Sequence, residues 1–208
     1  MPPVNEVEVI DDPAAAAVAL EPARARLLAE LAEPASAAAL AERLGIARQK
    51  VNYHLRALEQ HGLVREAETR RWGGITERRM VATAGSYLVS PSALGPAAAD
   101  PGRSADRLSA SYLLALAARV VREVGRLLRR AANTGQRLAT LSIDTEIRFR
   151  SAEERAAFSQ ELAAGIAALA ARYHDAAAPA GRLHRLVVVA HPIAGDTVSV
   201  STPDKATT

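Results

Sequence analysis

The sequence predicts an α+β fold, and three observations lead to this class. Two short helical patterns, separated by a glycine, are followed by two extended segments joined by a glycine pair. A longer helical pattern comes next. The last part of the chain then changes from alternation to a helical period and back. We therefore expect an N-terminal helical domain ending in a β-hairpin, a long linking helix, and a small C-terminal strand–helix–strand domain.

Composition supports a folded chain and limits its chemistry. Hydrophobic residues make up 49% of the 208 residues, which is enough for a packed core, but alanine carries much of that fraction, so we expect thin helix packing and a benefit from dimerisation. The formal charge of +3 is compatible with a nucleic-acid partner. The absence of cysteine excludes disulfides and thiolate metal sites. With no signal peptide and no apolar run of membrane length, we expect a cytoplasmic protein that does not contact a membrane.

The chain divides into five parts on composition. Residues 1–19 read as an acidic tail or a short edge strand, and residues 20–90 as the helical domain with its hairpin. Residues 91–103 are rich in proline, glycine, serine and alanine, which is typical of a linker. Residues 104–195 form the second domain, and residues 196–208 a polar tail.

The stretch Ala35–Leu63 predicts two helices joined by a tight turn. Ser36 can cap the first helix, and Gly45 supplies the permissive backbone that the turn needs. The second helix runs from about Arg48 to Gln60, and Gly62 ends it.

The second of these helices has two unlike faces. Val51, Leu55 and Leu58 fall at helical spacing and should pack against the preceding helix. The other face presents amides, long cations and an aromatic ring, which are groups that read bases in a major groove. The alternative is an ordinary solvated helix face. The residues of this face are Arg48, Gln49, Asn52, Tyr53 and Arg56.

Two extended segments, Val64–Ala67 and Glu77–Ala82, follow this helix, and Gly73-Gly74 suits a hairpin tip between them. A helix-turn-helix followed by a hairpin is the winged-helix plan. Arg70 and Arg71 near the tip could enter a minor groove or meet phosphates. Between Arg48 and Arg79 the chain has eight Arg and Lys residues against four acidic residues, and this local excess favours nucleic acid.

The run Val51–Val64, together with Ala38–Ile46, resembles the recognition-helix region of ArsR-type winged-helix transcriptional regulators. The resemblance covers about residues 20–90 and implies that the exposed side of Arg48–Arg56 meets DNA. The metal-sensing members commonly use cysteine, which this chain lacks, so we expect neither a metal nor another cofactor. The implied DNA-binding residues are Arg48, Gln49, Lys50, Asn52, Tyr53, His54 and Arg56, with Arg70 and Arg71 at the hairpin. Of these, we expect His54 to touch a phosphate or to lie at the helix-packing boundary rather than to read a base.

A long helix is predicted from Ser104 to about Asn133, with Ser104 or Asp106 as its cap and Gly135 at its end. One side carries large apolar residues at nearly heptad spacing. This stripe favours a dimer seam, and the alternative is a core-packing face. Its residues are Leu113, Leu116, Val120, Val124 and Leu127.

The C-terminal part predicts a strand at Leu138–Arg150, a helix from Ala152 to about His174, and a second strand at Leu183–Ala190. Ser151 and Glu154 have the spacing of a capping box at the helix start. So small a sheet needs the long helix or a second subunit to cover it. Pairing of these strands within one subunit or between two subunits stays open.

The sequence gives little support for catalysis. His174, His184 and His191, with Asp196, could in principle hold zinc or nickel, but their spacing fits no ligand pattern and chance placement explains it better. There is no glycine-rich phosphate loop after a strand and no Gly-x-Ser-x-Gly elbow.

We therefore expect a homodimeric, sequence-specific DNA-binding transcriptional regulator and not an enzyme. Its partner would be double-stranded DNA carrying an inverted-repeat operator, and its activity that of a repressor responding to a small molecule. Two alternatives remain: a constitutive dimeric regulator without ligand, and a winged-helix module that binds a partner protein.

Overall fold

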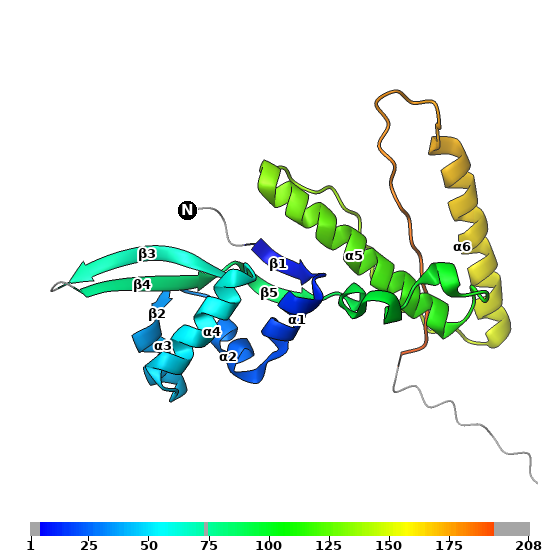
Figure 1. Ribbon diagram of the computed structural model, residues 1–208. Coiled ribbons are helices and arrows are strands. Elements are labelled where there is room, and N and C mark those ends of the chain that lie inside the picture. Colours follow the sequence, from blue (N-terminus) through cyan, green and yellow to red (C-terminus); the bar gives the residue numbers. More distant parts are fainter. Residues whose placement is uncertain (1–4, 73–74, 194–208) are drawn as a thin grey trace, which may run out of the picture. The chain divides into compact units, whose positions relative to one another are not determined.

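The computed structural model describes residues 5–72 and 75–193, and the chain separates into two units, Met1–Thr140 and Leu141–Thr208. The helices and strands of the first unit (Figure 1) are, in order, β1 Asn5–Ile10, α1 Pro13–Leu20, α2 Pro22–Glu30, β2 Ala35–Ser36, α3 Ala37–Leu44, α4 Arg48–Gln60, β3 Val64–Trp72, β4 Ile75–Ala82, β5 Ala84–Val89, the 3-10 helices η1 Pro91–Ala97 and η2 Pro101–Arg103, and α5 Ala110–Thr134. The second unit contains α6, Ala152–Tyr173.

The first two helices, α1 and α2, begin with the same kind of N-cap. The carboxylate of Asp12 accepts a hydrogen bond from the Ala15 N–H at 2.8 Å, and Glu21 accepts one from the Arg24 N–H at 3.0 Å. A proline occupies the start of each helix, where its missing N–H has no cost. Of the two readings of residues 1–19, the short strand is present as β1, and α1 follows it.

Strands of the first unit form two small sheets. In one, β2 and β3 flank β4 and both run antiparallel to it; in the other, β1 and β5 are parallel. The expected hairpin is present as β3 and β4, which extend away from the helices in Figure 1. The Tyr87 hydroxyl joins the two sheets, since it donates to the Leu63 carbonyl at 2.6 Å and accepts from the Thr83 N–H at 3.1 Å.

The core of the first unit lies between α1–α4 and the sheets. Its fully buried side chains come from α2, α3, α4 and the strands that follow, so the helix faces predicted to be apolar do meet. The largest of them are Leu27, Leu31, Leu40, Leu58, Val51, Val64 and Val81.

Residues 91–103, expected to be a linker, instead form η1 and η2, which lie against α1 and α5. The long helix also begins later than predicted, at Ala110. Its cap is Ser109, whose hydroxyl accepts from the Tyr112 N–H at 3.2 Å. Asp106 is instead used in the preceding turn, where its carboxylate accepts from the Leu108 N–H at 2.8 Å. Gly135 ends the helix in the left-handed conformation, as predicted.

Helix α5 packs on β1 through small residues. Ala115, Ala118 and Gly125 are its buried positions, and a Cβ on Gly125 would lie only 2.5 Å from the Val9 Cβ. Farther along, the Arg129 guanidinium donates to Asp11 at 2.5 Å and to Glu8 at 3.3 Å. Burial disfavours this charge, but the hydrogen bonds to the two carboxylates outweigh burial and raise the pKa of Arg129. The close contact at Gly125 and the ion pairs of Arg129 together hold α5 against β1.

The second unit contains one helix and no strand among its described residues, 141–193. Helix α6 begins as predicted: the Ser151 hydroxyl accepts from the Glu154 N–H at 3.2 Å, and Glu154 in turn accepts from the Arg150 N–H at 2.6 Å. The strands expected at Leu138–Arg150 and Leu183–Ala190 are irregular instead, so that part of the prediction is wrong for a single chain. A strand requires a backbone ladder with a neighbouring strand, and neither segment belongs to a sheet among the described residues.

We expect Gly125→Ala to weaken the contact between α5 and β1. The added methyl group must displace Val9, and overpacking of this kind costs about 1–3 kcal/mol of unfolding free energy. Urea unfolding followed by circular dichroism measures the effect. The matched control is Gly165→Ala in α6, where no atom lies within 4 Å of an added Cβ. That control should keep or raise stability, and an equal loss in both variants would contradict the close-packing account.

Candidate nucleic-acid interface

The turn between α3 and α4 is built by local capping. Ser36 accepts a hydrogen bond from the Ala39 N–H at 3.3 Å and so begins α3. Gly45 ends it with φ of 65°, a left-handed conformation that a side chain would strain. At the far end of α4, Gly62 has φ of 71°, and the Leu63 N–H bonds to the Leu58 carbonyl at 2.9 Å. The sequence predicted all three positions.

Burial divides α4 into the two expected faces. Val51, Leu55 and Leu58 are buried against the core, where Leu40 of α3 and Leu31 of α2 also lie. Every predicted DNA-binding residue of α4 except His54 is exposed. Because the inner face fixes the rotation of the helix, it also fixes which side chains point outward.

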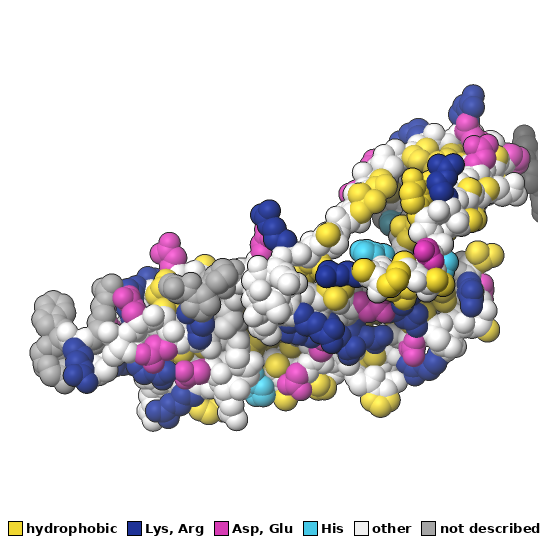
Figure 2. Space-filling view, turned by 90° about the horizontal axis from the view of Figure 1, so that it is seen from above, with side chains coloured by type: hydrophobic (Ala, Val, Ile, Leu, Met, Phe, Trp, Pro, Cys, Tyr) yellow, Lys and Arg dark blue, Asp and Glu magenta, His cyan; other side chains and the backbone are white. Residues whose placement is uncertain are grey.

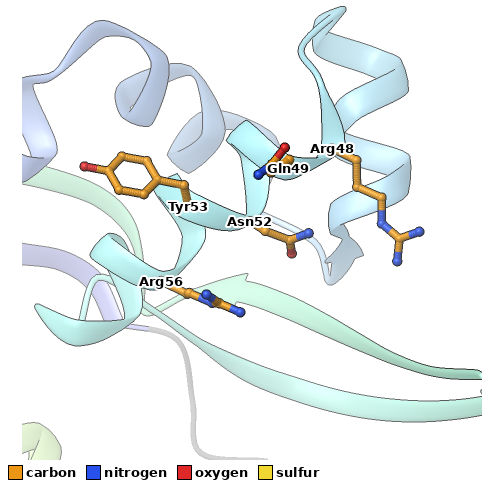
Figure 3. A pocket seen from close by; sticks show the side chains of 5 residues that line it. All are labelled: Arg48, Gln49, Asn52, Tyr53 and Arg56. Atoms are coloured by element: carbon orange, nitrogen blue, oxygen red, sulfur yellow. The ribbon is translucent and has the colours of Figure 1, made fainter.

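Five of the exposed side chains project from one side of α4 and line a solvent-open depression (Figure 3). They are Arg48, Gln49, Asn52, Tyr53 and Arg56. The set combines two guanidinium groups, two amides and a phenol, so it offers many hydrogen-bond donors and several acceptors on one surface. Lys50 is exposed on the same helix but does not line this depression.

His54 departs from this pattern because its ring is buried, with only 6% of the side chain exposed. Its Nδ1 atom lies 3.8 Å from Glu21 Oε2, and neither ring nitrogen has a hydrogen-bond partner among the described residues. Burial lowers the pKa of His54, aided by the charges of Arg24 and Lys50 and opposed by Glu21. His54 therefore belongs to the inner face of α4, and the expectation that it meets DNA does not fit its position.

The hairpin is held to the end of α4 by Arg78. Its guanidinium bonds to Glu59 of α4 and to Glu66 of β3, each at 2.6 Å. These hydrogen bonds, with that to Glu59 the stronger cause, raise the pKa of Arg78. The next residue, Arg79, pairs with Glu68 and with the carbonyl of Pro34. Sequence reasoning missed these links, because a count of charges does not say which ones face each other.

The ion pairs change how the local charge is distributed. Three of the four acidic residues between Arg48 and Arg79 are engaged by Arg78 and Arg79. The cations on the outer side of α4 form no salt bridge within the described residues. Part of the positive excess read from the sequence therefore stays on α4, at Arg48, Lys50 and Arg56.

Of the two hairpin arginines, Arg71 is exposed on β3, opposite Thr76 of β4. Arg70 lies opposite Glu77, but its side chain is outside the described part of the chain. Both belong to the same projecting hairpin as Arg78, which anchors it to α4.

The predicted dimer-seam residues lie on α5 opposite its buried small residues. Leu113, Leu116, Val120 and Val124 are half-buried, and Leu127 is 44% exposed. The contact with β1 uses the other side of the helix, where Gly125 meets Val9 and where Ala115 and Ala118 are also buried. The large apolar stripe is thus not the surface that holds α5 to β1.

In the described ranges 5–72 and 75–193, the structure brings together no group of three or more histidine and acidic side chains suited to a metal. His184 and His191 are exposed on irregular segments, with their Nδ1 atoms near backbone carbonyls at 2.9 Å. Asp196, the remaining residue weighed for a metal, lies outside these ranges.

A family model described as a helix-turn-helix domain matches residues 19–67. The match covers α2, α3 and α4 and reaches into β3. Residues 19–67 are a helix-turn-helix domain, and such domains are typical of DNA-binding transcription regulators and are not usually enzymes. No curated protein matches the sequence. Within the part of the chain that the structure describes, none of the helices combines the length and apolarity needed to cross a membrane.

We expect the stability of the helix-turn-helix domain to fall with acid because of His54. Its pKa is lowered in the folded state, so as the pH drops below the ordinary value near 6.5 the unfolded chain takes up the proton first. The stabilising contribution is complete above that value and is lost as the pH falls toward the folded-state pKa, with a slope of up to about 1.4 kcal/mol per pH unit.

Replacement of His54 by leucine tests this expectation. Leucine keeps an apolar body at the site and removes two buried nitrogens that lack partners, so the variant should be as stable as the parent or more so. Urea unfolding between pH 8 and pH 5 should show a shallower pH dependence in the variant. Parallel curves for the two proteins would contradict the role of His54.

Proposed function

We propose that the protein is a sequence-specific DNA-binding transcriptional regulator of the winged helix-turn-helix type, similar to ArsR-type regulators, and that it acts as a homodimer in the cytoplasm. The observation that carries the proposal is the exposed row on α4, directly after the turn of a helix-turn-helix domain. Helix-turn-helix proteins place this second helix in the major groove and read bases from its N-terminal half.

The side chains of this row suit base recognition. Gln49 and Asn52 can each make paired hydrogen bonds to adenine, and Arg48 can do so to guanine. Tyr53 and Arg56, one turn farther along, suit the phosphate backbone or a thymine methyl group. Ala47 at the start of α4 provides no side-chain cap, so the first N–H groups of the helix are left for a phosphate.

The β3–β4 hairpin would act as the wing. In this proposal Arg70 and Arg71 meet phosphates or a minor groove beside the site read by α4. The link from Arg78 to Glu59 and Glu66 supports it, because it holds the hairpin at a set angle to α4. A fixed angle lets both elements contact one duplex together.

A homodimer would place two α4 helices in successive major grooves of an inverted-repeat operator, about one helical turn apart. The stripe formed by Leu113, Leu116, Val120, Val124 and Leu127 supports dimerisation, because its large apolar side chains are left outside the contact with β1. A repressor of this kind would block a promoter. The presence of a second unit favours a response to a small molecule, which would shift the population between binding-competent and incompetent dimers.

The two alternatives make different demands on the same surface. A constitutive regulator would bind its operator equally well in every growth condition. A protein-binding module would not need the unneutralised cations of α4, and their presence favours DNA over a protein partner.

We expect Gln49→Ala and Asn52→Ala to weaken binding to the operator, by about 1–3 kcal/mol for each lost base contact, and to leave binding to random DNA nearly unchanged. Fluorescence anisotropy on the DNA upstream of the protein's own gene, over a salt series, measures both. Gln60→Ala is the control, because Gln60 is an exposed amide at the last position of α4. Weak binding that is equal on every DNA would overturn sequence-specific recognition.

Charge reversal at Arg70 and Arg71 tests the hairpin. If both contact phosphates, the double change to glutamate should weaken binding to all DNA sequences and lower the slope of log K against log salt by about 2, near one for each lost contact. Arg172→Glu reverses an exposed charge on α6 and serves as the control. A salt slope equal to that of the parent would remove the hairpin from the interface.

A further inference from the structure

The second unit has apolar patterns but no core of its own. None of its described residues, 141–193, is buried, although both α6 and its flanking segments carry large apolar side chains. Leu141 and Ile143 are more than 80% exposed, and Ile147, Val188 and Val189 about half exposed. Figure 2 shows hydrophobic side chains at the surface of the right-hand part, which contains α6. Without further burial, the apolar surface cannot offset the entropy of ordering these segments.

Residues 141–150 carry the pattern of a strand with one apolar side. Leu141, Ile143, Ile147 and Phe149 alternate with polar residues. The ring of Phe149 lies 5.3 Å from that of Phe158 on α6, so the apolar side of the segment meets its own helix at this end, while Leu141 and Ile143 stay exposed. The polar residues then lie on the opposite side, and the backbone edge is left for a neighbouring strand.

The charges on that polar side are arranged symmetrically about Ile147. Glu146 and Arg148 stand one residue to either side of it, and Asp144 and Arg150 three residues to either side. Acids precede the centre and bases follow it. In an antiparallel pair of two identical strands, residues at equal distances from the centre face each other. In such a pair, each acidic residue of one copy therefore faces a basic residue of the other copy.

We propose that residues 144–150 pair with the same residues of a second copy in an antiparallel ladder centred on Ile147. Glu146 then faces Arg148 of the other copy, and Asp144 faces its Arg150. The Arg150 guanidinium also bonds to Glu154 of its own chain at 2.7 Å, so in the pair it is shared between two carboxylates. Ile147 meets its own counterpart on the apolar side. The inference rests on the proposed homodimer and names the contact that joins its second units.

The alternative partner within the chain is residues 183–190, and it fits less well. Arg185 of that segment could face Asp144 or Glu146, but the segment has no carboxylate, so it offers no opposite charge to Arg148 or Arg150. The self-pair also places both α6 helices on one side of the sheet, because its two-fold axis is perpendicular to the sheet. Two strands alone are marginal in water, and two covering helices supply the missing burial.

A single cysteine tests the register, because the chain has none of its own. In the proposed pair the two Ile147 Cα atoms lie about 4.5–5.5 Å apart, within the range of a disulfide. Ile147→Cys should give a covalent dimer under mild oxidation, seen on a non-reducing gel. Ile143→Cys is the matched control, with the same side chain on the same side and greater exposure. Its two copies would be about 26 Å apart, eight residues at 3.3 Å each, and should not cross-link.

Charge exchange gives a second test that does not depend on Ile147. Glu146→Arg and Arg148→Glu should each raise the dissociation constant of the dimer by about tenfold or more, since each creates two like-charge pairs in the dimer. The double variant restores opposite charges and should recover the parent's affinity. A mixture of the two single variants should form heterodimers for the same reason. Analytical ultracentrifugation measures all four.

The outcomes separate this inference from the proposed function. Covalent dimers of the Ile147→Cys protein but not of the Ile143→Cys protein, with recovery in the double charge variant, support the pairing. A dimeric parent whose Ile147→Cys form does not cross-link, or cross-links no faster than Ile143→Cys, overturns the pairing and leaves the homodimer standing. A parent that is monomeric at all concentrations overturns both, while operator binding is judged separately by anisotropy.

Discussion

The packing of α4 onto the core is the constraint on which the interface depends. Val51, Leu55 and Leu58 are buried at intervals of one helical turn, beside Leu31 and Leu40. A helix held at three such points cannot rotate, because each residue turns it by about 100° and a shift of one position would bury charged groups. The outward side of α4 is thus determined by its inward side. Alanine-rich neighbours leave few large side chains to share this role.

Ion pairing then decides where positive charge accumulates. Arg78 and Arg79 hold the hairpin through Glu59, Glu66 and Glu68, at or close to the surface, so their net contribution to stability is small. Their larger effect is on the distribution of charge. Glu59 of α4 and the two hairpin carboxylates are paired with Arg78 and Arg79, and Arg48, Lys50 and Arg56 of α4 stay available for a polyanion. The same five side chains therefore hold the hairpin in place and shape the charge of the interface. They are Arg78, Arg79, Glu59, Glu66 and Glu68.

Local signals made much of the first unit predictable. Ser36, Gly45 and Gly135 act within a few residues of themselves, and the apolar period of α4 reports its burial directly. β1 could not be placed, because its parallel partner β5 lies about 80 residues away and only the fold brings them together. The sequence of α1 has almost no apolar periodicity, so its residues were expected to belong to the N-terminal tail. His54 was misplaced because a histidine suits either face of a helix.

Helix α5 shows why a stripe of large apolar residues is an incomplete guide. Hydrophobicity alone favours burial of the side of α5 that carries leucine and valine. Helix α5 instead meets β1 on the side with Ala118 and Gly125, where small residues let the backbones approach closely. In β1, Val9 faces α5, and the next residue, Ile10, faces the core shared with α4. The outer side of α5 thus carries the large apolar residues, while its inner side meets β1 through Gly125.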